Sequence, residues 1–180
     1  MAPTLDYEGC MVIVYDETGQ YVVDAVITDH NRSDTIRISH TLESVRSNER
    51  VNLLIVHPEV VNEYSGTLRS IIFGSRELAL YRQRPRQGRE AVRYTVNESA
   101  EAVLVTDNSA PVLETIQVNI VNMSTTGVMI VSQYGRFKIG DALEINLNLG
   151  GAESLIRARI VRDRFIEDGM VEFGCKLVFE

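Results

Sequence analysis

Apolar and polar residues alternate along most of this chain with a period of two rather than 3.6, which is typical of β-strands that bury one face. The clearest example is Leu143–Leu149, where four apolar side chains are separated by Glu, Asn and Asn. Turn formers separate the alternating runs, for example at Glu17–Gly19, His57–Pro58 and Gly150–Gly151. The pattern therefore predicts an all-β chain.

The predicted strands fall into two sets of six. In the first half they are Cys10–Tyr15, Gln20–Thr28, Thr35–Ser39, Arg50–Val56, Tyr64–Ile72 and Glu77–Arg82. In the second half they are Ala100–Thr106, Thr115–Val121, Gly127–Gln133, Ala142–Leu149, Leu155–Asp163 and Met170–Phe179. Because open sheet edges invite aggregation and closure removes them, we expect two small antiparallel six-stranded β-barrels.

Helix is scarce in this pattern. The one candidate is Thr41–Asn48, which opens with a weak cap-like Thr and has Glu43 two residues later. We expect it to form one or two turns at most.

An arginine-rich segment separates the two sets of strands. Residues 82–93 contain five arginines, together with Pro85, which disfavours helix, and Gly88, which can act as a hinge. The expected organisation is a β-barrel domain over residues 1–82, an Arg-rich linker over 83–93 and a second β-barrel over 94–180.

The charge of the chain excludes some functions. Its 180 residues carry a net charge of −7, which argues against a general binder of nucleic acid or membrane surfaces. Sixteen of the eighteen basic residues are arginine, whose planar fork suits phosphates and guanine edges; a bias of genome composition toward arginine would produce the same count. The two cysteines form no CxxC motif, and the N-terminus has no signal-like segment, so we expect a cytoplasmic protein.

The linker arginines are the first candidate for ligand binding. Arg89 and Arg93 are four residues apart, and Arg86 precedes them. If ordered, they need an anion, because like charges repel; if not, they form a solvated basic linker or one docked on the acidic first domain. The spacing alone leaves these alternatives open, since it recurs at Arg46 and Arg50.

The second candidate is a polar corner between two apolar strands. Asn122, Ser124 and Gly127 follow the spacing Asn-x-Ser-x-x-Gly, which occurs once in the chain. These are also ordinary turn residues, so an unremarkable hairpin is the alternative. As a site, the corner would offer two short hydrogen-bonding side chains and a glycine that lets a ligand approach the backbone.

Arg-x-x-x-Arg followed by Asn-x-Ser-x-x-Gly in a β domain resembles the PilZ family. Further likenesses are the segments Ile139–Ile145, Ala158–Arg162 and Glu172–Leu177, so the resemblance covers about residues 86–180. The first half resembles, more loosely, the N-terminal barrel of flagellar-brake-like proteins, for example at Gly19–Tyr21 and Tyr64–Leu68.

The resemblance implies a receptor for the bacterial second messenger cyclic di-GMP. Arg89 and Arg93 would hold its phosphates and guanine edges, and Asn122, Ser124 and Gly127 would form the floor on the barrel side. Further candidate contacts are Arg86 and Arg162. The linker would wrap the ligand and reorient the two domains, and a protein partner, for example in the motility machinery, would respond to the change. The family often has Asp at the position of Asn122 and Arg at that of Gly88, so the affinity and the number of bound ligands stay open.

Two other functions compete with the receptor hypothesis. One is a PilZ-like scaffold that binds proteins but no nucleotide, and the other is a barrel for single-stranded nucleic acid, which the scarcity of aromatics near the linker disfavours. No catalytic constellation, metal-ligand spacing or cofactor motif is recognisable, so we expect no enzyme, no metal and no cofactor. The expected partners are cyclic di-GMP and a protein, with neither DNA nor a membrane, and the protein would be a monomer or homodimer.

Overall fold

A computed structural model describes the fold of most of the chain. The described residues are 5–31, 34–40, 42, 45–70, 76–82, 92–105 and 114–179. They form strands, turns and irregular segments but no helix, which confirms the all-β prediction. Consequently, this part of the chain contains no apolar helix of the length that a bilayer crossing needs.

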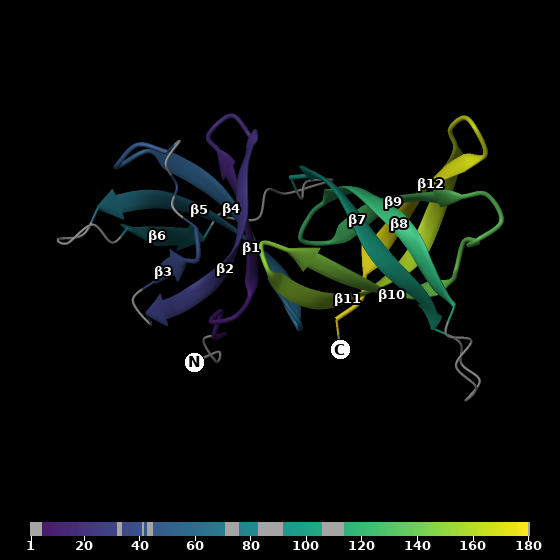
Figure 1. The fold of residues 1–180 in the computed structure, drawn as a ribbon, viewed down its shortest axis with the longest axis horizontal. Coiled ribbons are helices and arrows are strands. Elements are labelled where there is room, and N and C mark those ends of the chain that lie inside the picture. The colour runs from purple at the N-terminus through teal and green to yellow at the C-terminus, as the bar shows by residue number, and fades with distance from the viewer. Residues whose placement is uncertain are drawn as a thin grey trace. The chain divides into compact units, whose positions relative to one another are not determined.

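The first six strands form a closed barrel with the order β1-β2-β3-β6-β5-β4 (Figure 1). Their bounds are β1 Met11–Asp16, β2 Tyr21–Asn31, β3 Thr35–Ile38, β4 Arg50–His57, β5 Val60–Ser70 and β6 Arg76–Arg82. All pairs are antiparallel, as the closely spaced hairpins require. The interior is filled by inward-facing aliphatic side chains such as Val14, Ile27, Leu53 and Leu78, each at most 1% exposed.

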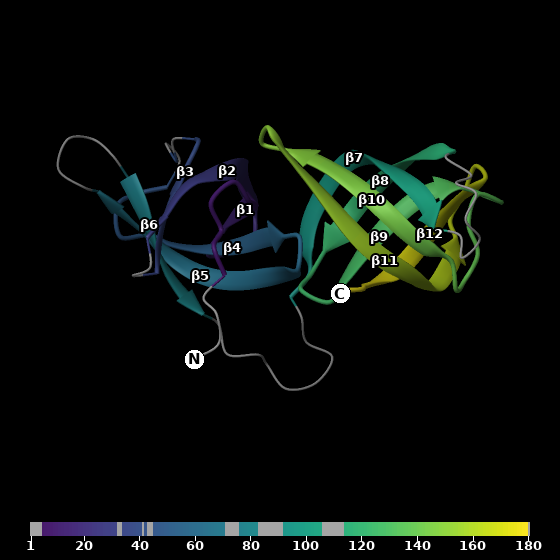
Figure 2. The ribbon, with the colours of Figure 1, turned by 90° about the horizontal axis from the view of Figure 1, so that it is seen from below.

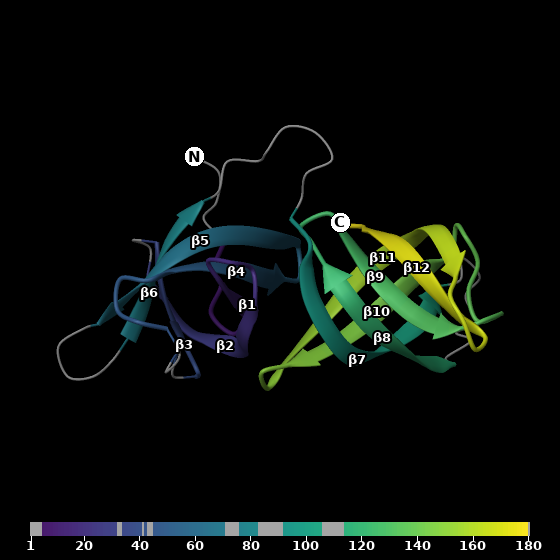
Figure 3. The ribbon, with the colours of Figure 1, turned by 90° about the horizontal axis from the view of Figure 1, so that it is seen from above.

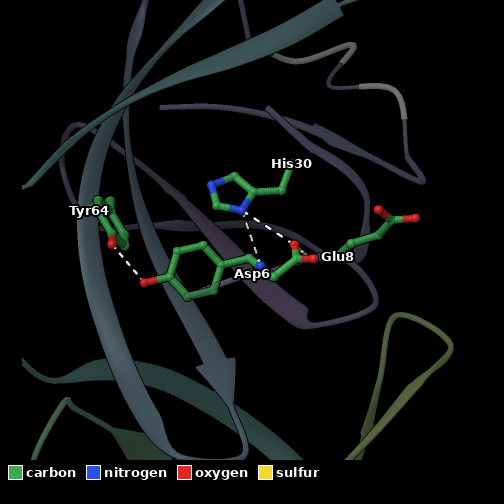
Figure 4. A network of polar contacts seen from close by, with 5 residues as sticks. Asp6, Glu8, His30 and Tyr64 are labelled. Atoms are coloured by element: carbon green, nitrogen blue, oxygen red, sulfur yellow. Dashed lines mark hydrogen bonds and ion pairs between the residues drawn. The ribbon is translucent and has the colours of Figure 1, made fainter. Parts of the chain in front are cut away.

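One end of this barrel carries a polar network around Tyr7 (Figure 4). The Tyr7 hydroxyl lies 2.8 Å from that of Tyr64. It also accepts a hydrogen bond from the Asn62 amide at 2.8 Å. The Tyr7 backbone N–H donates to Nδ1 of His30 at 3.2 Å, and Asp6 lies 3.6 Å from the same nitrogen. The buried hydroxyl of Tyr7 therefore has partners, as a buried polar group needs.

The other six strands form a second closed barrel with the order β10-β11-β12-β9-β8-β7 (Figures 2 and 3). Their bounds are β7 Tyr94–Val105, β8 Thr115–Met123, β9 Gly127–Gln133, β10 Ala142–Leu149, β11 Ala152–Phe165 and β12 Met170–Leu177. Strict alternation places Ile120, Ile130 and Phe173 inside, each at most 1% exposed. Both predicted barrels are thus confirmed, and neither sheet is left open.

Some predicted bounds are wrong. We expected a strand to begin at Ala100, but β7 begins at Tyr94. The reason is a bulge at Thr95–Glu98, where Asn97 has a positive φ of 54°, so a polar stretch with broken alternation is still part of the ladder. Likewise β5 begins at Val60 rather than Tyr64, because the turn after His57 is very short.

Two further predictions concern residues that the structure does not describe. In the helix candidate Thr41–Asn48, the described residues 42 and 45–48 form a bend and a turn, whereas 41, 43 and 44 lie outside the described residues. Residues 83–91 of the linker also lie outside them. The domain boundaries at 82/83 and 93/94 therefore stay a prediction.

Candidate functional site

A tight corner between β8 and β9 holds the Asn-x-Ser-x-x-Gly motif. The Ser124 N–H donates to the Gly127 carbonyl at 2.8 Å. The Ser124 hydroxyl accepts from the N–H groups of Thr126 at 3.3 Å and Gly127 at 3.2 Å, and the serine is only 4% exposed. A serine side chain that bonds the following backbone in this way stabilises a turn. The hydroxyl of Ser124 thus holds the corner together from within.

Replacing Ser124 by alanine should lower the free energy of unfolding by about 1 kcal/mol, because two N–H groups of the corner lose their acceptor. It should also weaken ligand binding by a similar amount. Chemical denaturation and calorimetry measure the two effects, with Thr125→Ala as a neighbouring control. An unchanged unfolding curve would show that the hydroxyl does not organise the corner.

Packing against β12 requires a glycine at position 127, which the sequence did not reveal. A Cβ atom built on Gly127 would lie 2.7 Å from the carbonyl oxygen of Cys175 on β12, closer than real Cβ atoms come to a backbone oxygen. The neighbouring Thr126 carbonyl accepts the N–H of Leu177 at 3.0 Å, so the corner is bonded to the end of β12. Burial also raises the pKa of Cys175 to about 12, so its thiol stays neutral beside this contact.

Asn122 lies on the outer face of the barrel, half-buried, and its amide donates to the Met129 sulfur at 3.4 Å. A bulge after Ile120 turns Asn122 to this face. The amide therefore lies on the surface beside the corner, where a ligand could reach it.

Strand register connects Asn122 to Arg162. Asn122 pairs with Met129 on β9, Met129 with Gly174 on β12, and Gly174 with Arg162 on β11. These strands are neighbours in the barrel (Figure 3). All four residues face outward, so they form one row across the outer surface, which we call the Asn122 row. Two predicted site residues that are 40 positions apart in the sequence thus lie on one face.

Arg93 lies directly before β7, next to the corner. Tyr94 pairs with Met123, and Thr95 pairs with Asn122. Because Tyr94 is buried and side chains alternate, Arg93 belongs to the outer face, and it is exposed. The structure therefore brings Arg93 to the corner formed by Asn122–Gly127.

A second row contains cations that the sequence analysis missed. Gly127 pairs with Lys176 on β12, which pairs with Arg159 on β11. Both cations are exposed on the same face, and Arg159 donates to the Gly140 carbonyl at 3.0 Å. Alternation could have put each on the outer face of its strand, but only the register places both in one row with Gly127.

The cations of this face differ in their partners. Arg157 pairs with Glu144 at 3.0 Å, and Arg164 pairs with Glu172 at 3.0 Å. In contrast, no carboxylate within the described part of the chain forms a salt bridge with the cations that surround the corner. These are Arg93, Arg159, Arg162 and Lys176. Such a cluster in an acidic chain suits an anionic ligand.

Other predicted site residues fall outside what the structure describes. Arg86 and Arg89 belong to the segment 83–91, which lies outside the described residues. Their part in the site stays a prediction. Among the residues described, no group of His, Cys, Asp and Glu could hold a metal ion.

The sequence model of the PilZ domain matches residues 82–179. The chain belongs to the PilZ family. The match spans the whole second barrel, including the corner and both rows, and confirms the resemblance on which the sequence analysis relied. PilZ proteins are effectors rather than enzymes, which agrees with the expectation of no catalytic site.

Several solved structures of low sequence identity are similar to this chain, whereas no curated protein matches it. The MrkH–c-di-GMP complex of K. pneumoniae is 10% identical with a TM-score of 0.39, and the match covers 94% of this chain and 79% of MrkH. E. coli YcgR in complex with c-di-GMP is 10% identical with a TM-score of 0.36, and the match covers 94% of this chain and 76% of YcgR. The Bacillus subtilis inhibitor of motility MotI/DgrA is 13% identical with a TM-score of 0.36, and the match covers 97% of this chain and 88% of MotI/DgrA.

Proposed function

We propose that this protein is a signalling receptor that binds cyclic di-GMP on the outer face of its second barrel. The core of the site is Arg89, Arg93, Asn122, Ser124 and Gly127, with Arg86 and Arg162 as further contacts. The guanidinium groups bind phosphate oxygens or the O6 and N7 edge of guanine, and the corner forms the floor.

The observation that carries this proposal is the placement around the corner of cations that form no salt bridge within the described part of the chain. Cyclic di-GMP has two phosphates, and their charges need partners that are not already occupied by carboxylates. Lys176 lies beside Gly127, Arg159 lies one strand further along the same row, and Arg93 lies beside the corner; none of the three has a carboxylate partner among the described residues. Family membership makes the cyclic dinucleotide, rather than another phosphate ester, the expected ligand.

The linker supplies the switch in this proposal. Residues 83–93 fold over the ligand, and this changes the relative orientation of the two barrels because the bound state is favoured by ligand contacts. The reoriented pair then acts on a protein partner, with motility or biofilm formation as the output. The net charge of −7 disfavours DNA as that partner. The protein would act as a monomer or homodimer.

Calorimetric titration of the full chain with cyclic di-GMP tests the proposal directly. Saturable binding is expected, and cyclic di-AMP serves as the matched ligand control, since it has the same phosphates with different bases. No detectable binding would overturn the receptor function and favour a PilZ-like scaffold that binds proteins alone.

Ligand should also protect the linker from proteases. Trypsin cuts after arginine, so sites within Arg82–Arg89 report whether the linker is covered. Cutting there is expected to slow when cyclic di-GMP is present, while cutting at Arg136, on a turn of the second barrel, is unchanged. Equal cutting of the linker with and without ligand would contradict the wrapping mechanism.

A further inference from the structure

Gly174 is a glycine in the interior of a strand, where glycine is unfavourable. It lies near the middle of β12, and its φ is not in the left-handed region. Glycine weakens a strand relative to alanine, and in such a place it often marks the close approach of another group. Gly174 lies in no turn, so a neighbouring group that approaches the backbone must account for the glycine.

The group above Gly174 is the side chain of Arg162. A Cβ atom at position 174 would lie 2.4 Å from Nε and 2.7 Å from Cγ of Arg162. Arg162 follows a bulge in β11, with the register shifting between Ile160 and Arg162. Bulges redirect side chains. The bulge in β11 and the missing side chain at Gly174 thus together let one arginine lie across the neighbouring strand.

The position of Arg162 brings its guanidinium toward the corner. Its side chain reaches from β11 onto β12, one strand closer to Met129 and Asn122 in the Asn122 row. Arg162 is exposed, and no carboxylate in the described part of the chain pairs with it. The row therefore has an amide at one side, a thioether in the middle and an unoccupied guanidinium at the other side.

We propose that Gly174 is a positioning residue that keeps Arg162 flat on the barrel, where Arg162 binds the O6 and N7 edge of one guanine of the ligand. The base lies over Met129, whose polarisable sulfur suits an aromatic face, between Arg162 and Asn122. A paired contact of Arg with O6 and N7 distinguishes guanine from adenine. This inference rests on the proposed function, because it assumes that the ligand is cyclic di-GMP.

The test compares wild type, Arg162→Ala, Gly174→Ala and the double variant, each titrated with cyclic di-GMP and with cyclic di-AMP. Arg162→Ala should weaken cyclic di-GMP binding about 5- to 150-fold, the range for one paired guanine contact, with little change for cyclic di-AMP. Gly174→Ala should weaken cyclic di-GMP binding in the same selective way, although alanine is less unfavourable than glycine inside a strand. In the double variant, Gly174→Ala should have no further effect, because the residue that it displaces is gone.

Arg164→Ala is the matched control, since Arg164 is exposed on the same strand and already paired with Glu172. It should bind both ligands like wild type. Circular dichroism melts show whether each variant is folded, and Arg162→Ala removes the contact without adding an atom. The test therefore does not depend on whether Gly174→Ala folds.

The outcomes separate the two proposals. If wild type binds cyclic di-GMP but Arg162→Ala and Gly174→Ala bind it equally well, the inference is wrong and the receptor function stands. An equal loss for both dinucleotides would place Arg162 on a phosphate and overturn the guanine contact. Additive effects in the double variant would overturn the positioning role of Gly174. If wild type does not bind, the proposed function fails and the inference fails with it.

Discussion

Replacing Arg93 with alanine is expected to weaken cyclic di-GMP binding by about 2–5 kcal/mol, which is the usual loss when one partner of a desolvated charge pair is removed. Arg93 lies beside the corner and has no carboxylate partner among the described residues, so the ligand phosphate or guanine edge is the group that loses its contact. Because the side chain is exposed, the fold should not change. Calorimetry gives the affinity, and a thermal melt gives the stability.

Arg136→Ala is the control for this prediction. Arg136 is exposed in the same barrel and pairs with Glu114 at 2.8 Å, away from the corner, so its loss should leave the affinity unchanged. Arg89→Ala is expected to behave like Arg93→Ala if the linker closes over the ligand. Wild-type affinity in both Arg89→Ala and Arg93→Ala would remove the Arg-x-x-x-Arg motif from the site.

The second large effect is expected from Gly127→Ala, which should lower the free energy of unfolding by about 1–3 kcal/mol, the range for an atom forced into a packed place. The added Cβ would meet the Cys175 carbonyl at 2.7 Å. That carbonyl cannot move freely, because β12 is bonded to β9 on one side and β11 on the other. The shift should distort the corner, so ligand binding should weaken as well.

Chemical denaturation of the full chain measures this effect, with Thr126→Ala as the control. Thr126 is the exposed neighbour of Gly127, and its backbone hydrogen bond to Leu177 does not need its side chain, whose hydroxyl makes only a long contact of 3.5 Å with the Ser124 hydroxyl. A variant that unfolds like wild type but binds ligand poorly would mean that Gly127 is needed for ligand contact and that the backbone of β12 can shift to accommodate a Cβ atom. A variant unchanged in both measurements would contradict the packing role and the ligand role together.

Most of the fold could be predicted from local pattern. Each strand has its own alternation and its own turn formers, so the twelve strands and their grouping into two barrels were predicted without knowledge of their neighbours. Prediction failed where alternation breaks. Residues Thr95–Ser99 look like a polar connection, yet they belong to β7 because a bulge at Asn97 accommodates them in the ladder.

The candidate site was only partly predictable. Asn122, Ser124 and Gly127 share a short motif, and Arg93 precedes it by a spacing that resembles the family. The part that Lys176, Arg159, Met129 and Gly174 have in the candidate site was not predictable, because nothing local distinguishes them from other strand residues. The structure adds a turn-stabilising role for Ser124, whose hydroxyl bonds the backbone of its own corner, and its contact with ligand stays a prediction.

The number of strands, the all-β class and the polar corner are properties of short segments, and the order of residues was sufficient to establish them. The pairing of segments far apart in the chain could not be established in this way. It depends on the register that two neighbouring strands adopt when both bury their apolar faces. That register alone places Arg162 over Gly174 and the Cys175 carbonyl against Gly127. The chemistry of the outer face is therefore a consequence of barrel closure.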